Sequence, residues 1–223
     1  MRAILLALSI SVSAGGDAVM AQDVNDQVRL PSPNRTGTFA LEEALQKRRS
    51  VREFGRSPLQ LAEISQILWS AQGVTHAEGF RTAPSAGALY PLETYLVVGD
   101  VAGLPPGVYR YDPGEHALTL IRRGDLRARL AAAALGQSWI RGAPAVLALT
   151  GVYRRTTGKY GERGLRYVHI EVGHAAQNVY LEATARGLAT AMVGAFVDAE
   201  VAEVLGLPGD HAPLALMPFG HTR

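Results

Sequence analysis

The sequence predicts a layered α+β fold, and three features of the pattern support this prediction. The turn Asp112-Pro113-Gly114 separates two apolar runs, residues 108–111 and 118–121, as in a β-hairpin. Residues 145–149 are apolar without interruption, which is typical of a central strand covered on both faces. A hairpin combined with strands that are joined through helices favours an α+β domain over a purely doubly wound one.

Apolar residues at helical spacing predict five helices, and glycine follows four of them, where it can end a helix. The second helix is expected to open with Ser57 as N-cap and Pro58 in the first turn. The helices are expected within residues 38–49, 57–72, 125–135, 167–186 and 198–205, and the other two strands at 94–98 and 212–219.

Composition fits one globular domain preceded by a leader. Hydrophobic residues make up 48% of the 223 residues, which is enough for a core. The net charge of +2 comes without a concentrated basic stripe, so a nucleic-acid partner is not expected. The absence of cysteine excludes disulfides, thiolate catalysis and cysteine-zinc sites. His169 and His174 are five positions apart and do not share a helix face, so no metal site is expected.

The first residues are typical of a secretory signal peptide. A positive start at Arg2 precedes an apolar stretch, and small residues around 18–21 suit cleavage before Gln22. The apolar stretch is too short to span a bilayer, so no stable membrane span is expected. We therefore expect a signal peptide at 1–21, a polar linker or strap at 22–37, and one domain at 38–223 in an exported, periplasmic protein.

The first candidate site block places Arg48, Ser50 and Arg52 at alternate positions, with Arg49 between them. In extended chain these three side chains face one side, and guanidinium groups with a hydroxyl suit a phosphate monoester. Cations at the end of a helix are also favoured by its dipole, which explains the block equally without a ligand. No Gly-rich dinucleotide or Walker loop occurs in the chain.

Two further blocks consist of small residues. Pro84, Ser85 and Ala86 begin one, and Val193, Gly194 and Ala195 form the other. Small side chains let the backbone approach a flat ligand and offer it N–H groups, although a plain loop or a buried strand end has the same composition. Ser85 lacks the G-x-S-x-G surroundings of a hydrolase nucleophile.

Taken together and in this order, the blocks resemble the FMN-dependent nitroreductase family. The resemblance rests on residues 47–52, 84–91, 191–196 and 217–221, and the form of the second block is similar to the SagB/ThcOx-type dehydrogenase branch. It implies a three-layer nitroreductase-like fold with a central mixed, mostly antiparallel sheet flanked by helices. It also implies a homodimer with flavin sites at the interface.

The resemblance also implies roles for individual residues. Arg48 and Ser50 would hold the FMN phosphate and ribityl chain, and Arg52 would stabilise the negative charge of reduced flavin. Pro84, Ser85 and Ala86 would reach the flavin of the partner subunit. The other expected cofactor-binding residues are Arg49, Gln137, Val193, Gly194, Ala195 and Arg223.

Lys159 and Tyr160 are the candidate catalytic residues. In azoline-oxidising relatives a Lys-Tyr pair in this region assists proton removal, and both side chains can move protons beside a cofactor. The neighbouring residues 154–158 are polar, so a surface loop explains the pair as well.

The expected function is an FMN-dependent oxidoreductase that transfers hydride through flavin N5 in a ping-pong cycle and acts on a small-molecule substrate. NAD(P)H is a candidate electron donor. One alternative is a SagB-like dehydrogenase that oxidises an azoline-like substrate with Lys159 as base. Another alternative is a non-catalytic exported flavin-binding protein.

Overall fold

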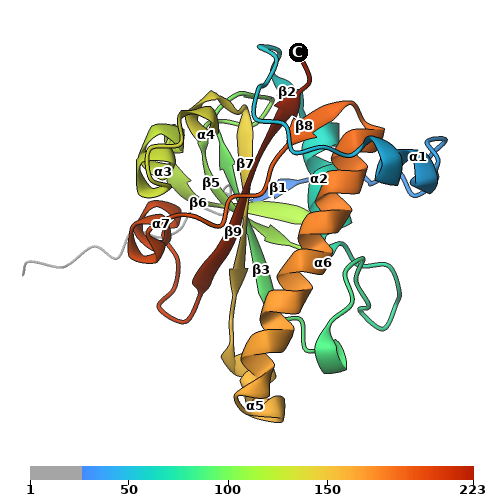
Figure 1. Cartoon of the computed structure of the whole chain (residues 1–223), viewed down its shortest axis with the longest axis vertical. Helices are drawn as coiled ribbons and strands as arrows, with labels where there is room; N and C mark the ends of the chain where they lie inside the picture. The colour runs from blue at the N-terminus through green and yellow to red at the C-terminus, as the bar shows by residue number, and fades with distance from the viewer. Residues whose placement is uncertain (1–26) are drawn as a thin grey trace, which may run out of the picture.

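A single antiparallel sheet organises the molecule (Figure 1). In the computed structural model, the described residues are 27–223, so the predicted signal peptide lies outside them. The strands of this sheet are β1 (Gln27–Arg29), β3 (Leu92–Val98), β5 (Gly107–Asp112), β6 (Ala117–Arg123), β7 (Ala145–Gly151), β8 (Leu188–Thr190) and β9 (Ala212–His221). Their order is β1-β6-β5-β3-β7-β9-β8, and all neighbouring pairs are antiparallel.

Helices cover both faces of this sheet. They are α1 (Leu41–Lys47), α2 (Leu61–Gln72), α3 (Arg127–Ala133), α4 (Ser138–Gly142), α5 (Arg154–Tyr160), α6 (Arg163–Ala185), α7 (Asp198–Leu205) and the 3-10 turn η1 (Ala86–Ala88). Figure 1 shows α2 and α6 on one side of the sheet and α3, α4 and α7 on the other. A separate parallel pair joins β2 (Leu59–Gln60) to β4 (Val101–Ala102).

Successive residues of β3 divide the core into two layers, because side chains alternate across a strand. Leu96 belongs to the core shared with α2 and α6, and Val97 belongs to the core shared with α3, α4 and α7. Both side chains are fully buried. The predicted three-layer α+β architecture is therefore confirmed, and the only parallel pairing among the described strands lies outside the large sheet.

The main predicted elements are present, with two differences at helix starts. Helix α2 begins at Leu61, because Leu59 and Gln60 are extended and pair with β4. The predicted N-cap Ser57 is therefore wrong: Gln60 caps the helix in a capping box, and its N–H donates to Glu63 Oε2 at 2.8 Å. Helix α6 begins at Arg163, four positions before the predicted start at residue 167.

Residues 27–37 belong to the segment predicted as a linker or strap, and they contribute a strand to the sheet. β1 pairs with β6, and the Asn34 N–H donates to Gln66 Oε1 at 2.8 Å, so side-chain and sheet contacts both fix this segment. No helix within residues 27–223 is both long enough and apolar enough to cross a membrane.

Candidate functional site

One edge of the molecule brings residues 48–52 beside residues 190–195, and we call this region the basic edge. The Val51 N–H donates to the Thr190 carbonyl at 2.9 Å, which fixes the two segments alongside each other. Tyr180 of α6 lies between them: its hydroxyl is 3.0 Å from Ser50 Oγ and accepts the Met192 N–H at 2.8 Å. Ser50 and Met192 are thus held by a common side chain.

The three arginines of the basic edge have different surroundings. Arg48 lies over the ring of Tyr180 at 5.2 Å, and Arg52 lies over the ring of Trp139 at 5.6 Å. Arg49 instead donates to the carbonyls of Gln46 and Arg48, so it closes the end of α1. Within residues 27–223, no carboxylate pairs with Arg48 or Arg52, which leaves two cations available for an anion.

The predicted Gly194 block forms the second wall of the basic edge. Gln137 Nε2 donates to the Ala195 carbonyl at 3.0 Å, so this predicted side chain does meet the predicted backbone. The Val193 N–H donates to the Leu216 carbonyl, and the Leu216 N–H donates to the Val193 carbonyl. The N–H of Val193 is therefore already engaged. The N–H groups of Gly194 and Ala195 have no partner in the described part of the chain, and a Cβ on Gly194 would meet nothing within 4 Å. These two N–H groups are accessible donors.

Arg223 lies next to the basic edge. Its guanidinium pairs with Glu53 at 2.9 Å, directly after Arg52 in the chain, and both side chains are well exposed. Arg223, expected as a cofactor-binding cation, therefore lies near Arg52, but a carboxylate already neutralises it.

A second predicted group forms elsewhere, and we call it the Lys-Tyr corner: residues 84–90 with Lys159 and Tyr160. A Cβ placed on Gly87 would lie 2.7 Å from Tyr160 Oη and 3.0 Å from Lys159 Nζ. The two polar side chains of α5 therefore converge on the predicted small-residue loop. The segment around them is helix α5, where a surface loop had been the alternative.

A hollow of about 260 Å³ lies beside this corner, between the loop and α6. Pro84, Ser85 and Ala86 line one side of it, and Glu171 lines the other. Glu171 is only 2% exposed, and its Oε1 has no partner in the described part of the chain. Burial raises the pKa of Glu171 to about 7, against the opposing effects of a Ser85 hydrogen bond and the Arg81 charge.

The two groups lie at different points along α6. Tyr180 contacts the basic edge, and Tyr167 contacts Tyr160 of the Lys-Tyr corner with ring centroids 5.1 Å apart. At roughly 1.5 Å of rise per residue, these two tyrosines are about 20 Å apart along the helix. One chain therefore does not bring the predicted catalytic pair to its own predicted phosphate-binding residues.

The sequence pattern of the nitroreductase family matches residues 45–221, which includes both groups. The chain belongs to the nitroreductase family. It is thus an oxidoreductase of a family whose pattern covers most of its length.

Individual nitroreductase-family relatives agree with this assignment. Protein MJ1384 of Methanocaldococcus jannaschii is 54% identical over 180 residues, covering 81% of this chain and 90% of that protein. A nitroreductase structure from Ralstonia eutropha JMP134 matches with a TM-score of 0.79 at 30% identity, covering 91% of this chain and 92% of the other.

A third relative places the chain near the SagB-like branch of the nitroreductase family. The microcin B17-processing protein McbC of Escherichia coli is 30% identical over 149 residues, covering 64% of this chain but only 55% of that protein. A chain of the E. coli microcin synthetase McbBCD complex matches with a TM-score of 0.69 at 25% identity, covering 96% of this chain and 85% of the other.

Sequence reasoning missed Tyr180 and Glu171. Glu171 could have been found, because it falls on the helix face of Val168, Val172 and Ala175, where a lone carboxylate is unusual. Tyr180 gave no comparable signal, because its role depends on which chain segments pack against α6.

Proposed function

We propose that this chain is an FMN-dependent oxidoreductase whose phosphate-binding part is the basic edge. The observation that carries the proposal is the convergence of Arg48, Ser50 and Arg52 with the unpartnered N–H groups of Gly194 and Ala195. When bound, FMN would supply the redox chemistry by taking a hydride at N5 from a donor and giving it to an acceptor in a ping-pong cycle.

The residues of the basic edge suit separate parts of that cofactor. Arg48 and Ser50 would bind the phosphate, since a guanidinium without a carboxylate partner and a nearby hydroxyl are strong phosphate ligands. Arg52 would offset negative charge on the ring. The N–H groups of Gln137 donate to Ala134 and Ala195, so its amide oxygen would accept from the polar edge of the ring. Gly194 and Ala195 would direct N–H groups at a ring nitrogen. Arg49 donates only to backbone carbonyls and would contribute general positive charge, whereas Glu53 already neutralises Arg223.

We propose that the protein acts as a homodimer in which the Lys-Tyr corner of one chain completes the flavin site of the other. The separation of the two groups along α6 supports this arrangement. Exposed apolar side chains support it as well: Leu41 is 59% and Leu45 is 53% exposed on α1, and Leu165 and Ile170 are exposed on α6. Apolar groups at this density on adjoining helices are typical of an interface.

We further propose that the protein works outside the cytoplasm, on the basis of the sequence of residues 1–21. A donor other than nicotinamide would then serve it, since nicotinamide is scarce there. Fractionation of cells that express the full chain, with N-terminal sequencing of the product, tests this point. A product that remains in the cytoplasm with residues 1–21 intact would contradict it.

The visible spectrum of the purified protein tests the main proposal. We expect the absorption bands of oxidised flavin, and tight binding of added FMN by protein stripped of cofactor. Arg48→Ala should weaken FMN binding by at least about tenfold, because it removes a charge-assisted hydrogen bond. Arg129→Ala, on the far helix α3 in a surface ion pair with Glu203, is the control. A colourless protein that does not bind added FMN would refute the proposal. Bound FMN that no tested donor reduces would favour a non-catalytic flavin-binding protein.

A second candidate function is the oxidation of an azoline-like ring, favoured by the convergence of Lys159 and Tyr160 on Gly87. Such an oxidation removes a proton and a hydride from the ring, and Lys159 would take the proton. Lys159→Ala should leave reduction of bound flavin by NAD(P)H intact but abolish oxidation of a synthetic thiazoline peptide. Equal loss of both activities, or of neither, would exclude Lys159 as the base.

A further inference from the structure

A polar hollow of about 220 Å³ lies where β3 begins and β5 ends, apart from the residues expected to hold flavin. Three arginines from separate segments line it: Arg81 of the loop after α2, Arg110 of β5 and Arg155 of α5. Such a concentration of guanidinium groups at one enclosed point requires negative charge to balance it.

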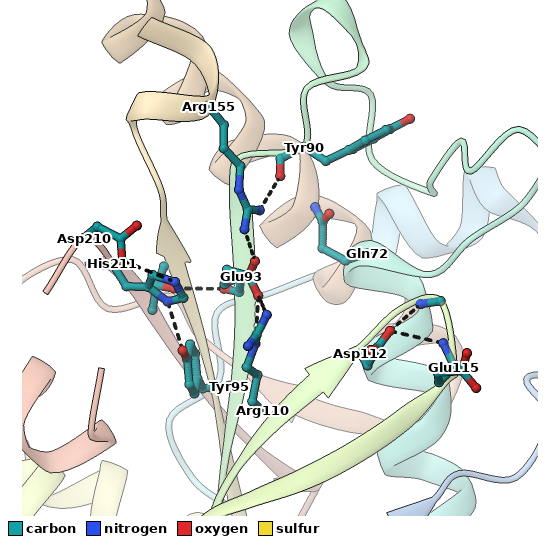
Figure 2. Close-up of polar contacts among 12 residues, drawn as sticks. Gln72, Tyr90, Glu93, Tyr95, Arg110, Asp112, Glu115, Arg155, Asp210 and His211 are labelled. Atoms are coloured by element: carbon teal, nitrogen blue, oxygen red, sulfur yellow. Dashed lines mark hydrogen bonds and ion pairs between the residues drawn. The ribbon is translucent and has the colours of Figure 1, made fainter. Parts of the chain in front are cut away.

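Glu93 balances two of these arginines. Figure 2 shows its carboxylate between Arg110 and Arg155. Arg110 Nε lies 3.0 Å from Oε2, and the Arg155 guanidinium reaches Oε1 at 2.5 Å. The Glu93 side chain is 9% exposed, whereas those of Arg110 and Arg155 are 48% and 36% exposed, so only the carboxylate end of the two pairs is shielded from water. The one other carboxylate that lines the hollow, Asp112, accepts the N–H groups of Gly114 and Glu115.

Arg81 has no such partner. Its guanidinium donates to the amide oxygen of Gln72 at 2.9 Å and lies over the ring of Tyr90 at 4.6 Å. Within residues 27–223 no carboxylate forms an ion pair with it, and Glu93 and Glu171 act on it only at longer range. Burial lowers the pKa of Arg81 by more than the charges of Glu93 and Glu171 raise it.

The charges that line the hollow do not balance. Three guanidinium groups, those of Arg81, Arg110 and Arg155, meet two carboxylates, those of Glu93 and Asp112. One positive charge is left for a ligand to balance.

We propose that this hollow binds a small organic carboxylate, held by the Arg81 guanidinium. A planar carboxylate matches the paired donors of a guanidinium, and its single negative charge matches the single uncompensated cation. Phosphate carries more charge than the hollow leaves unbalanced. The bound carboxylate would also be in contact, through its neighbours, with the Lys-Tyr corner, because Tyr90 belongs to that corner. Tyr90 Oη accepts the backbone N–H of Arg81 at 3.3 Å, and the Tyr90 carbonyl accepts from the Arg155 guanidinium at 3.0 Å.

Calorimetric titration and thermal unfolding of the full chain with propionate or inorganic phosphate test the proposal, and neither measurement depends on flavin. We expect saturable propionate binding that raises Tm. Arg81→Lys keeps the charge but loses the paired donors, so it should leave Tm of the ligand-free protein nearly unchanged, yet weaken propionate binding about three- to tenfold. Arg81→Gln should weaken it more than about tenfold, and Arg129→Gln should bind as the unmodified protein does.

The possible outcomes are distinct. Propionate binding that both Arg81→Lys and Arg81→Gln weaken supports the site. The absence of saturable propionate binding, or equal binding by these two variants and the unmodified protein, overturns the site. Tighter binding of phosphate than of propionate overturns the carboxylate assignment. All of these results are independent of whether the protein binds FMN.

Discussion

Tyr180 lies 3.0 Å from Ser50, although 130 positions separate the two residues in the chain. The Tyr180 hydroxyl accepts the Met192 N–H, so its own proton is available for Ser50 Oγ. Ser50 then keeps its hydroxyl proton for another acceptor. The pair therefore prepares Ser50 as a donor on the side where Arg48 supplies positive charge.

Replacing Tyr180 with Phe should weaken FMN binding by about three- to tenfold, because Ser50 loses its orienting partner and the Met192 N–H loses its acceptor. Fluorescence titration of flavin-free protein measures the change. Tyr153→Phe is the matched control, since it removes a hydroxyl that bonds His169 away from the basic edge. Equal FMN affinity in Tyr180→Phe and the unmodified protein would show that the hydroxyl plays no part in binding.

Gly87→Ala should damage the Lys-Tyr corner. Gly87 has φ of +63°, and an added Cβ would lie 2.7 Å from Tyr160 Oη. The strain should lower the free energy of unfolding by about 1–2 kcal/mol, and the displaced side chains should slow Lys159-dependent oxidation. Urea unfolding and azoline turnover are the two measurements.

Gly158→Ala is the control for that change, because Gly158 lies within α5 and an added Cβ there meets nothing within 4 Å. Its stability should be unchanged or slightly higher, since alanine favours helix. If Gly87→Ala oxidises the azoline at the unmodified rate, Lys159 and Tyr160 do not act where they converge.

Leu45→Glu should shift the protein toward monomer. Leu45 is 53% exposed on α1, so the charge will not disturb the fold of one chain, but it will oppose burial in an interface. Light scattering after size exclusion gives the mass. Ile121→Glu on β6, 39% exposed in the single chain, should leave the mass unchanged. If Leu45→Glu and the unmodified protein have the same mass, α1 lies outside any interface.

Continuous local patterns explain which parts of the fold could be predicted. β7 is apolar over residues 145–149, and a glycine with φ of +68° follows α7, so both were found at or near their observed bounds. β1, β2, β4 and β8 have only two or three residues each, and pairing with distant strands creates them. α5 was not predicted because the sequence around it is polar. Two of its polar residues form ion pairs with distant carboxylates, Arg154 with Asp210 and Arg155 with Glu93.

The candidate site follows the same division. Gln137 and Ala195 were predicted separately, and the structure joins them through a hydrogen bond of 3.0 Å. Tyr180 and Arg81 could not be predicted from the sequence. Tyr180 matters because Ser50 and Met192 contact it, and Arg81 matters because no carboxylate within residues 27–223 forms an ion pair with it. Contacts of this kind depend on how α6 and the loop after α2 pack, and no local pattern encodes that packing.

Stability should depend on pH through Glu171, whose pKa is about 7 in the folded chain against an ordinary value of 4.5. Between these values the folded state binds more protons than the unfolded state, so the free energy of unfolding falls as pH rises. The total fall is up to about 3 kcal/mol. Glu171→Gln, which stays neutral, should remove this slope and be the more stable form at pH 8. Glu200→Gln on the exposed face of α7 should retain the slope. Urea unfolding at pH 5 and pH 8 measures both variants, and an unchanged slope in Glu171→Gln would assign the pH dependence to other groups.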